Sequence, residues 1–132
     1  WSDMSSFYAQ QFPIIYEEVQ KVNAAPGIAS GLFYVWDEKS QLTELAAAIP
    51  VPAGTKIESN TIQVINIPAS KAVFADYFGA YDKLQEAYNS IRKYLADNNL
   101  KEKTPSIEQY ITDPAKEKDT TKWRTKIVFL VE

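Results

Sequence analysis

Glu108 and Tyr110 are the residues whose types and spacing best fit a chemical role. They stand two residues apart within 107–112, a stretch rich in strand-forming side chains. On one face of a strand their backbones lie about 7 Å apart, so both side chains can reach one small ligand. A carboxylate and a phenol so placed can hold a cation or act as an acid/base pair. The alternative is that Glu108 only pairs with Arg124 or Lys126 across a hairpin.

The composition excludes several other kinds of chemistry. The 132 residues include no cysteine and no histidine, so a disulfide, a thiolate nucleophile, a Ser-His-Asp triad and His- or Cys-ligated zinc are all excluded. We therefore expect no metal site and no cofactor. With 14 basic and 17 acidic residues, the net charge of −3 disfavours direct nucleic-acid contact. No apolar run approaches the roughly 20 residues of a membrane span, so we expect no membrane contact and a cytoplasmic location.

Two helices and several strands must position these residues. Apolar periodicity predicts helices over 3–24 and 81–97, the first either kinked or divided at Pro13. We predict strands over 32–36, 42–51, 61–67 continuing after Pro68 through 71–78, 107–112 and 123–131.

Alternation along these strands gathers further aromatic and charged residues on the face of Glu108. The apolar side chains of the other face, such as Phe33 and Ile127, are expected to pack under the helices. An aromatic-walled concavity with a few charges suits a flat or cationic ligand. Tyr34 and Trp36 could equally be ordinary sheet residues, and Trp123 could anchor the core or the rim. The candidate ligand contacts are Tyr34, Trp36, Glu44, Glu108, Tyr110, Trp123 and Lys126.

The two halves of the chain contain similar elements in the same order. Tyr34-Val35-Trp36-Asp37 matches Tyr110-Ile111-Thr112-Asp113. We predict one α+β domain over 1–132, a duplicated β-α-β-β unit with halves 1–54 and 60–132. The first strand of the first half is missing, as expected of a piece cut from a longer protein. A sheet edge left free in this way would favour a homodimer.

The second half resembles a known family. The residues that carry the likeness are Gly79-Ala80-Tyr81, Tyr88 and Tyr94, Asn98-Asn99-Leu100, Pro105, Glu108 to Pro114 and Trp123 to Ile127. Over about 60–131 they resemble the GyrI-like small-molecule-binding domain, the effector-binding domain of AraC-type and MerR-type transcription regulators. The resemblance implies a curved antiparallel sheet with two helices on one face. On the other face it implies a groove that takes hydrophobic, often cationic, molecules, as in multidrug binding.

Lys126 departs from the family pattern, in which a Glu usually follows the Arg-Thr of the closing strand and serves as the acidic groove residue. Glu108 or Glu44 must then serve, or the ligand is neutral or anionic. We expect a module that senses small hydrophobic or aromatic molecules and is linked to transcription regulation. One alternative is a small hydrolase of electrophilic molecules that uses Glu108 and Tyr110. A protein-interaction module is the other.

Overall fold

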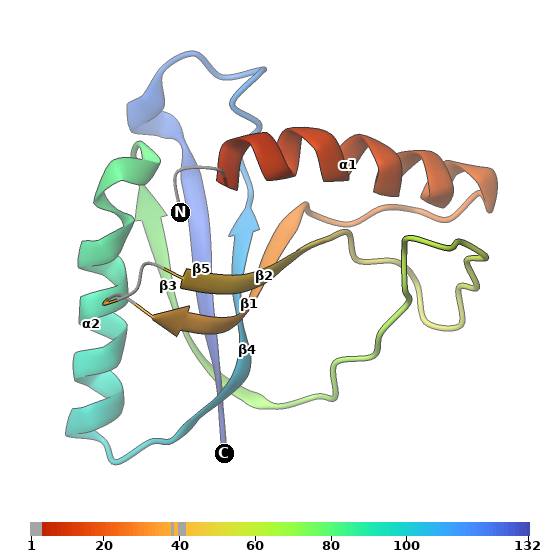
Figure 1. Ribbon diagram of the computed structural model, residues 1–132. Coiled ribbons are helices and arrows are strands. Elements are labelled where there is room, and N and C mark those ends of the chain that lie inside the picture. Colours follow the sequence, from red (N-terminus) through yellow and green to blue (C-terminus); the bar gives the residue numbers. More distant parts are fainter. Residues whose placement is uncertain (1–3, 38, 40–41) are drawn as a thin grey trace.

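The chain folds as an α+β unit in which two helices lie against an antiparallel sheet (Figure 1). This computed structural model describes residues 4–37, 39 and 42–132. Within them the elements are α1 Met4–Lys21, β1 Ser30–Asp37, β2 Leu42–Ala48, β3 Lys71–Phe78, α2 Leu84–Asp97, β4 Glu102–Tyr110 and β5 Arg124–Val131, with 3-10 turns at Tyr81–Lys83 and Thr120–Lys122.

The sheet has the order β2-β1-β4-β5-β3, and every neighbouring pair of strands is antiparallel. The two halves of the chain meet where β1 pairs with β4. There Gly31 is opposite Glu108, and Glu108 is opposite Ile127 of β5. Directly opposed residues share a face of the sheet, so these three positions form one row on the same side.

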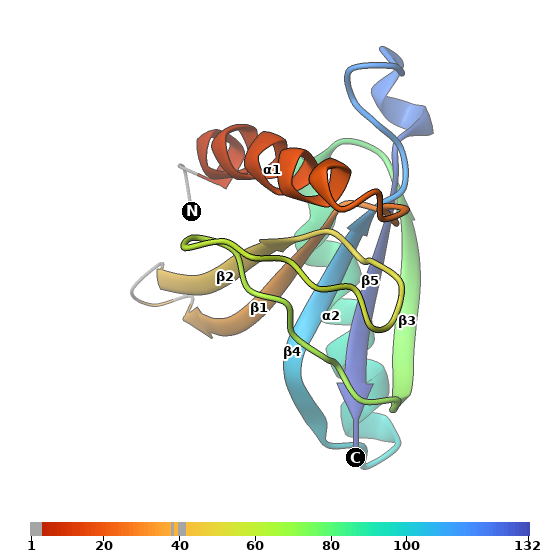
Figure 2. The same cartoon turned by 90° about the vertical axis from the view of Figure 1, so that its right-hand side faces the viewer.

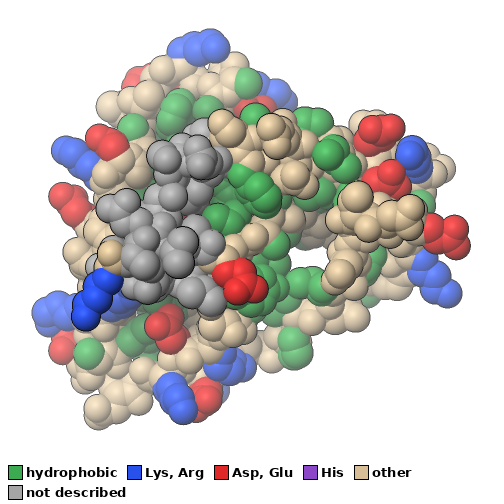
Figure 3. Space-filling model, in the orientation of Figure 1, with side chains coloured by type: hydrophobic (Ala, Val, Ile, Leu, Met, Phe, Trp, Pro, Cys, Tyr) green, Lys and Arg blue, Asp and Glu red, His purple; other side chains and the backbone are tan. Residues whose placement is uncertain are grey.

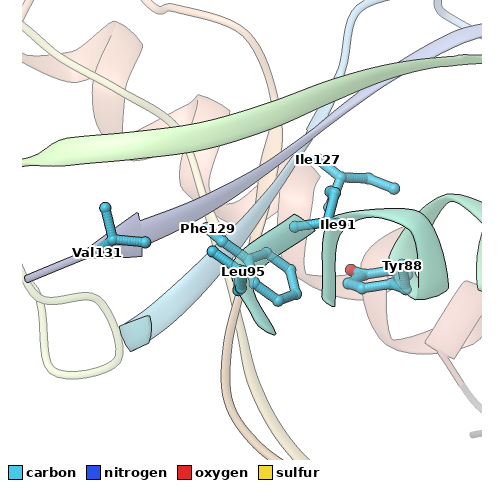
Figure 4. Packing of buried hydrophobic residues seen from close by; sticks show 6 residues of the cluster. All are labelled: Tyr88, Ile91, Leu95, Ile127, Phe129 and Val131. Carbon is cyan, nitrogen blue, oxygen red and sulfur yellow. The ribbon is translucent and has the colours of Figure 1, made fainter. Parts of the chain in front are cut away.

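The hydrophobic core lies between α2 and the middle of the sheet. Tyr88, Ile91 and Leu95 of α2 pack against the β5 side chains Ile127, Phe129 and Val131 (Figure 4). Burial alternates along β5, so its odd-numbered residues from Thr125 to Val131 face the helix. Ile127 is completely buried, which identifies the row that contains Glu108 as the helix-facing side.

The helix α1 is continuous through Pro13, so the predicted division into two helices does not occur. Two residues after each helix ends, an asparagine has the left-handed conformation: Asn23 with φ 55° and Asn99 with φ 53°. This conformation turns the chain away from the helix and lets the next amide bond back to the last turn. Among the described residues, no helix has the length and apolar character needed to cross a membrane.

The segment between β2 and β3 differs from the sequence prediction. Residues 61–67 alternate like a strand but form none, and Val64 and Ile65 stay 44% and 50% exposed. After Pro68 the chain joins the sheet as the edge strand β3, which pairs with β5, whereas 61–67 pairs with no strand of the described sheet. The segment instead crosses the face of the sheet opposite α2 (Figure 2).

Candidate functional site

A pocket of about 790 Å³ lies between the two helices, above the row of Gly31 and Glu108. Its volume falls in the range of small-molecule sites. Hydrophobic side chains lie along the side of α1 that faces the strands (Figure 3). The aromatic residues of the lining are Tyr8, Phe12, Tyr16, Tyr81, Tyr88 and Tyr110.

Glu108 is the polar centre of this pocket. It comes from β4, and its side chain is only 4% exposed. The Tyr88 hydroxyl of α2 donates a short hydrogen bond to Oε2, and the Tyr110 hydroxyl donates to Oε1 at 2.9 Å. Both carboxylate oxygens therefore have a phenolic partner, and the partners come from different elements. A buried carboxylate requires such partners, because a charge without them is very unfavourable in an apolar site.

Burial changes the protonation behaviour of the whole group. Desolvation raises the pKa of Glu108 above its ordinary value of 4.5, and the hydrogen bonds from Tyr88 and Tyr110 oppose part of that rise. Burial, followed by the charge of Glu108, also raises the pKa of Tyr88 and of Tyr110. The pKa of Tyr8 is raised to about 12, again mainly by burial. These phenols therefore act as neutral hydrogen-bond donors at physiological pH.

The helix α1 joins the same network through Tyr8. Its hydroxyl lies 3.0 Å from that of Tyr110, and the two rings meet edge to face with centroids 5.5 Å apart. Tyr110 has one hydroxyl hydrogen, and the carboxylate is the stronger acceptor, so Tyr8 donates to Tyr110 while Tyr110 donates to Glu108. Gly31 makes room for this contact, because a Cβ there would overlap the Tyr8 hydroxyl and lie 3.0 Å from that of Tyr110.

The pocket lining carries negative charge only. Besides Glu108 it includes the carboxylates of Asp82 and Asp113, both exposed at the rim. No lysine or arginine lines the pocket in the described part of the chain. An aromatic lining with acidic groups suits a cation better than an anion.

The register places Glu108 and Tyr110 on the face that carries the helices. The sequence pattern predicts them on the opposite face, together with Tyr34 and Lys126. The alternation predicted within each strand is present. However, Glu108 is opposite Ile127, so the two side chains share one face of the sheet, whereas the sequence pattern places them on opposite faces. A difference of one residue in relative register moves a whole set of side chains to the other face. The pocket therefore lies on the helix side, and the sheet face away from the helices does not form it.

Of the seven predicted ligand contacts, Glu108 and Tyr110 line this pocket, and four with described side chains do not: Tyr34, Glu44, Trp123 and Lys126. Tyr34 lines a smaller hollow of about 360 Å³ on the opposite face. Glu44 is exposed in β2, and the Lys126 ammonium lies 4.7 Å from the ring centroid of Phe74. Trp36 belongs to β1, but its side chain is outside the described part.

Trp123 stands just behind the lining. Its ring centroid is 5.2 Å from that of Tyr81, and its indole N–H donates to the Glu117 carbonyl at 2.8 Å. Trp123 therefore supports a pocket residue and does not itself face the cavity.

Sequence reasoning missed the aromatic residues that the helices contribute. Tyr8, Phe12 and Tyr16 follow each other at intervals of four, which places them on one side of a helix. That spacing was the available signal.

Known structures share the fold of this chain. The crystal structure of the EcmrR C-terminal domain has a TM-score of 0.78 at 30% identity, over 96% of this chain and 83% of that one. A cryo-EM structure of an EcmrR–DNA complex has a TM-score of 0.79 at 29% identity over 96% of this chain, which spans 49% of that chain. An uncharacterized conserved protein from Listeria innocua shares the fold, with a TM-score of 0.67 at 14% identity, 82% of this chain and 65% of that one.

A family model also matches this chain. No curated protein matches the chain. The model of the GyrI-like small molecule binding domain matches residues 5–132, which is nearly the whole sequence. The match agrees with the resemblance seen in Glu108 to Pro114 and extends it to the first half. The chain therefore belongs to the family of GyrI-like small-molecule-binding domains.

Proposed function

We propose that this chain binds small hydrophobic or aromatic cations in the pocket between α1 and α2, and that it acts as a ligand-sensing module. The observation that carries the proposal is the buried carboxylate of Glu108 within a lining of tyrosines that contains no lysine or arginine among the described residues. Of the two acids considered for this role, Glu108 and not Glu44 is thus the group that balances the charge of the ligand.

Electrostatics give such a site its preference. An ionised Glu108 is unfavourable in a dry pocket, and the raised pKa reflects that cost. A bound cation restores the missing countercharge, and the faces of the surrounding rings attract it as well. A neutral ligand gains only the apolar contact, and an anion meets three carboxylates. We therefore expect the order of affinity to be cation, then neutral molecule, then anion.

Sensing follows from the position of the pocket between the two halves. Tyr8 and Phe12 belong to α1, Tyr88 belongs to α2, and a ligand that touches both helices favours arrangements in which they close on it. One similar structure is a complex with DNA, and it contains a chain about twice as long as this one. We propose that the module reports ligand binding to a linked DNA-binding part. A cytoplasmic location, a homodimer and the absence of direct contact with nucleic acid stay predictions.

The hydrolase alternative rests on the 2.9 Å hydrogen bond between Tyr110 and Glu108, which brings the two proposed catalytic groups into contact. The raised pKa of Tyr110 opposes a tyrosinate nucleophile, but a neutral phenol can still act as an acid. Incubation with an aromatic epoxide distinguishes the two functions. Turnover that is lost in Glu108→Gln would favour the enzyme, whereas binding without turnover favours the sensor.

The protein-interaction alternative also stays a prediction. The exposed aromatic pair Phe74 and Phe78 on β3 is the surface that fits it.

A thermal-unfolding experiment tests the sensor proposal. Benzyltrimethylammonium, benzyl alcohol and benzenesulfonate serve as the cationic, neutral and anionic probes. A ligand at about 100 times its dissociation constant stabilises the folded state by about 2.7 kcal/mol. We expect this stabilisation with the cation, and we expect Glu108→Gln to remove it.

Two variants provide matched controls for charge. Glu44→Gln removes an acid outside the pocket, and Lys126→Glu adds one on the opposite face of the sheet. Neither should change the response to the cation by more than about twofold, because neither side chain contacts the ligand. A cation response that survives Glu108→Gln but disappears in Glu44→Gln would refute the site. An equal response to all three probes would refute the preference for cations.

A further inference from the structure

We infer that the pocket selects elongated dications, with one positive group at Glu108 and the second at the rim carboxylates Asp82 and Asp113. This inference rests on the proposed function and deepens it, because it names the class of ligand. It is carried by the separation of the negative charges within one cavity, by the aromatic rings between them and by the size of the cavity.

The acidic groups that line the pocket lie at different depths. Glu108 is 4% exposed at the inner end, where Tyr88 and Tyr110 bond to it. Asp82 stands in the 3-10 turn before α2, and Asp113 stands in the loop after β4. Both rim residues are exposed, and both line the same cavity as Glu108. A ligand with a single positive group can occupy only one of the two ends.

A continuous series of aromatic rings connects the two ends. Tyr8 contacts Tyr110 at 5.5 Å between centroids, and Tyr110 contacts Tyr81 at 6.0 Å. Tyr81 lies within the influence of both acidic ends, since the charges of Glu108 and of Asp113 each contribute to the rise in its pKa. An apolar linker between two cationic groups would lie along these rings and keep both groups near a carboxylate.

The cavity is larger than a single quaternary ammonium group requires. About 790 Å³ is near the upper part of the range for drug-sized ligands. A compact monocation at Glu108 would leave the outer part of the cavity filled with water. A longer molecule displaces that water from the apolar rings and gains the rim charges as well.

Two probes of equal chain length test the inference. Decamethonium carries a trimethylammonium group at each end of its alkyl chain, and decyltrimethylammonium carries one. Isothermal titration calorimetry measures both affinities for the native chain and for the double variant Asp82→Asn/Asp113→Asn. We expect native protein to bind the dication about tenfold more tightly, and the double variant to lose most of that preference. Exposed ion pairs contribute up to about fivefold each in affinity, so two of them can supply this ratio.

The substitutions preserve the local structure. The Asp113 carboxylate accepts a hydrogen bond from the Ala115 amide at 2.9 Å, and an asparagine side-chain oxygen can accept it too. The control variant Asp97→Asn/Glu132→Gln removes the same amount of negative charge far from the pocket. Its two residues lie at the end of the molecule that contains the C-terminus, and α1 lies at the opposite end (Figure 1). This control variant should leave both affinities within about twofold, because exposed charges beyond about 10 Å are screened.

The outcomes separate this inference from the proposed function. Loss of the dication preference in the rim variant, but not in the control, supports it. Equal binding of the two probes to native protein overturns the inference, and the proposed function survives if Glu108→Gln still abolishes binding. A preference that persists in the rim variant overturns the inference in the same way. If native protein binds neither probe nor benzyltrimethylammonium, both proposals fail.

Discussion

The two halves of the chain end their helices in the same way. In α1 the Ala24 amide donates to the Val19 carbonyl at 3.2 Å, and in α2 the Leu100 amide donates to the Leu95 carbonyl at 2.9 Å. Each bond closes the last turn beside a left-handed asparagine. Val19 and Leu95 are both buried there, so each helix is anchored at its C-terminal end by an equivalent aliphatic residue.

The halves differ in how the rest of each helix is held. The helix α2 buries Tyr88 and Ile91 as well as Leu95 in the core against β5. Of the described α1 side chains, only Val19 is buried, and Ile14 remains 42% exposed. The second half therefore provides the fixed frame of the pocket. The first half provides a wall that is held by aromatic and hydroxyl contacts, and those contacts are what a ligand can replace.

A core truncation gives the largest expected effect and tests this difference directly. Phe129→Ala removes a fully buried ring beneath α2, and we expect the free energy of unfolding to fall by about 3–5 kcal/mol. Phe12→Ala removes a ring of the same size from the pocket wall in α1 and should cost about 1 kcal/mol. Urea unfolding measures both. Equal losses would contradict the division into a frame and a loosely held wall.

Much of the fold could be predicted from the sequence because packing follows simple periodicity. The helix predicted over 81–97 is observed with its long part at Leu84–Asp97, and 71–78 is a strand as predicted. Phe33 of β1 and Ile127 of β5 face the helices as predicted, since Phe33 shares the face of Gly31 and Ile127 packs against α2. These positions obey the rule that apolar side chains face the helices.

The rule that apolar side chains face the helices fails at the candidate site. In β4 the side chains that face the helices are Glu108 and Tyr110, while the apolar Ile107 is opposite Leu32 on the other face. Pattern reasoning assigns the polar set to the face away from the helices, and here that assignment fails. Functional sites are where such failures are expected, because they bury polar groups that the core would exclude. The sequence match between Tyr34 and Tyr110 led, for a related reason, to a wrong prediction that both lie on the face of the site. Gly31 and Phe33, not Tyr34, share the face of Glu108 and Tyr110.

A pH series tests the charge that the second half buries. The pKa of Glu108 is raised in the folded state, so between its ordinary value of 4.5 and that raised value the folded chain holds more protons than the unfolded one. The free energy of unfolding should therefore fall as pH rises through this window. Each unit of the rise in pKa corresponds to about 1.4 kcal/mol.

Glu108→Gln removes this titration and is the matched comparison. Relative to native protein, the free energy of unfolding of this variant should increase as the pH rises. Urea unfolding of both proteins at a series of pH values measures this difference. The affinity for benzyltrimethylammonium should show the opposite trend in native protein and weaken on acidification, because protonation removes the countercharge. A native stability advantage over Glu108→Gln that grew with pH would show that Glu108 is stabilised as a carboxylate, contrary to its burial.

The contact between the halves at Gly31 gives the smallest of these effects. Gly31→Ala places a methyl group where the Tyr8 hydroxyl lies, so Tyr8 must leave Tyr110 and the wall of α1 shifts. We expect a loss of about 1 kcal/mol, the contribution of one part-buried hydrogen bond with its packing. Tyr8→Phe removes the obstructing hydroxyl, so Gly31→Ala should cost less in that background, and a double-mutant cycle measures the difference. Additive losses would mean that the two residues are not coupled, and that α1 is held over the pocket by contacts other than the hydroxyl chain from Tyr8 to Glu108.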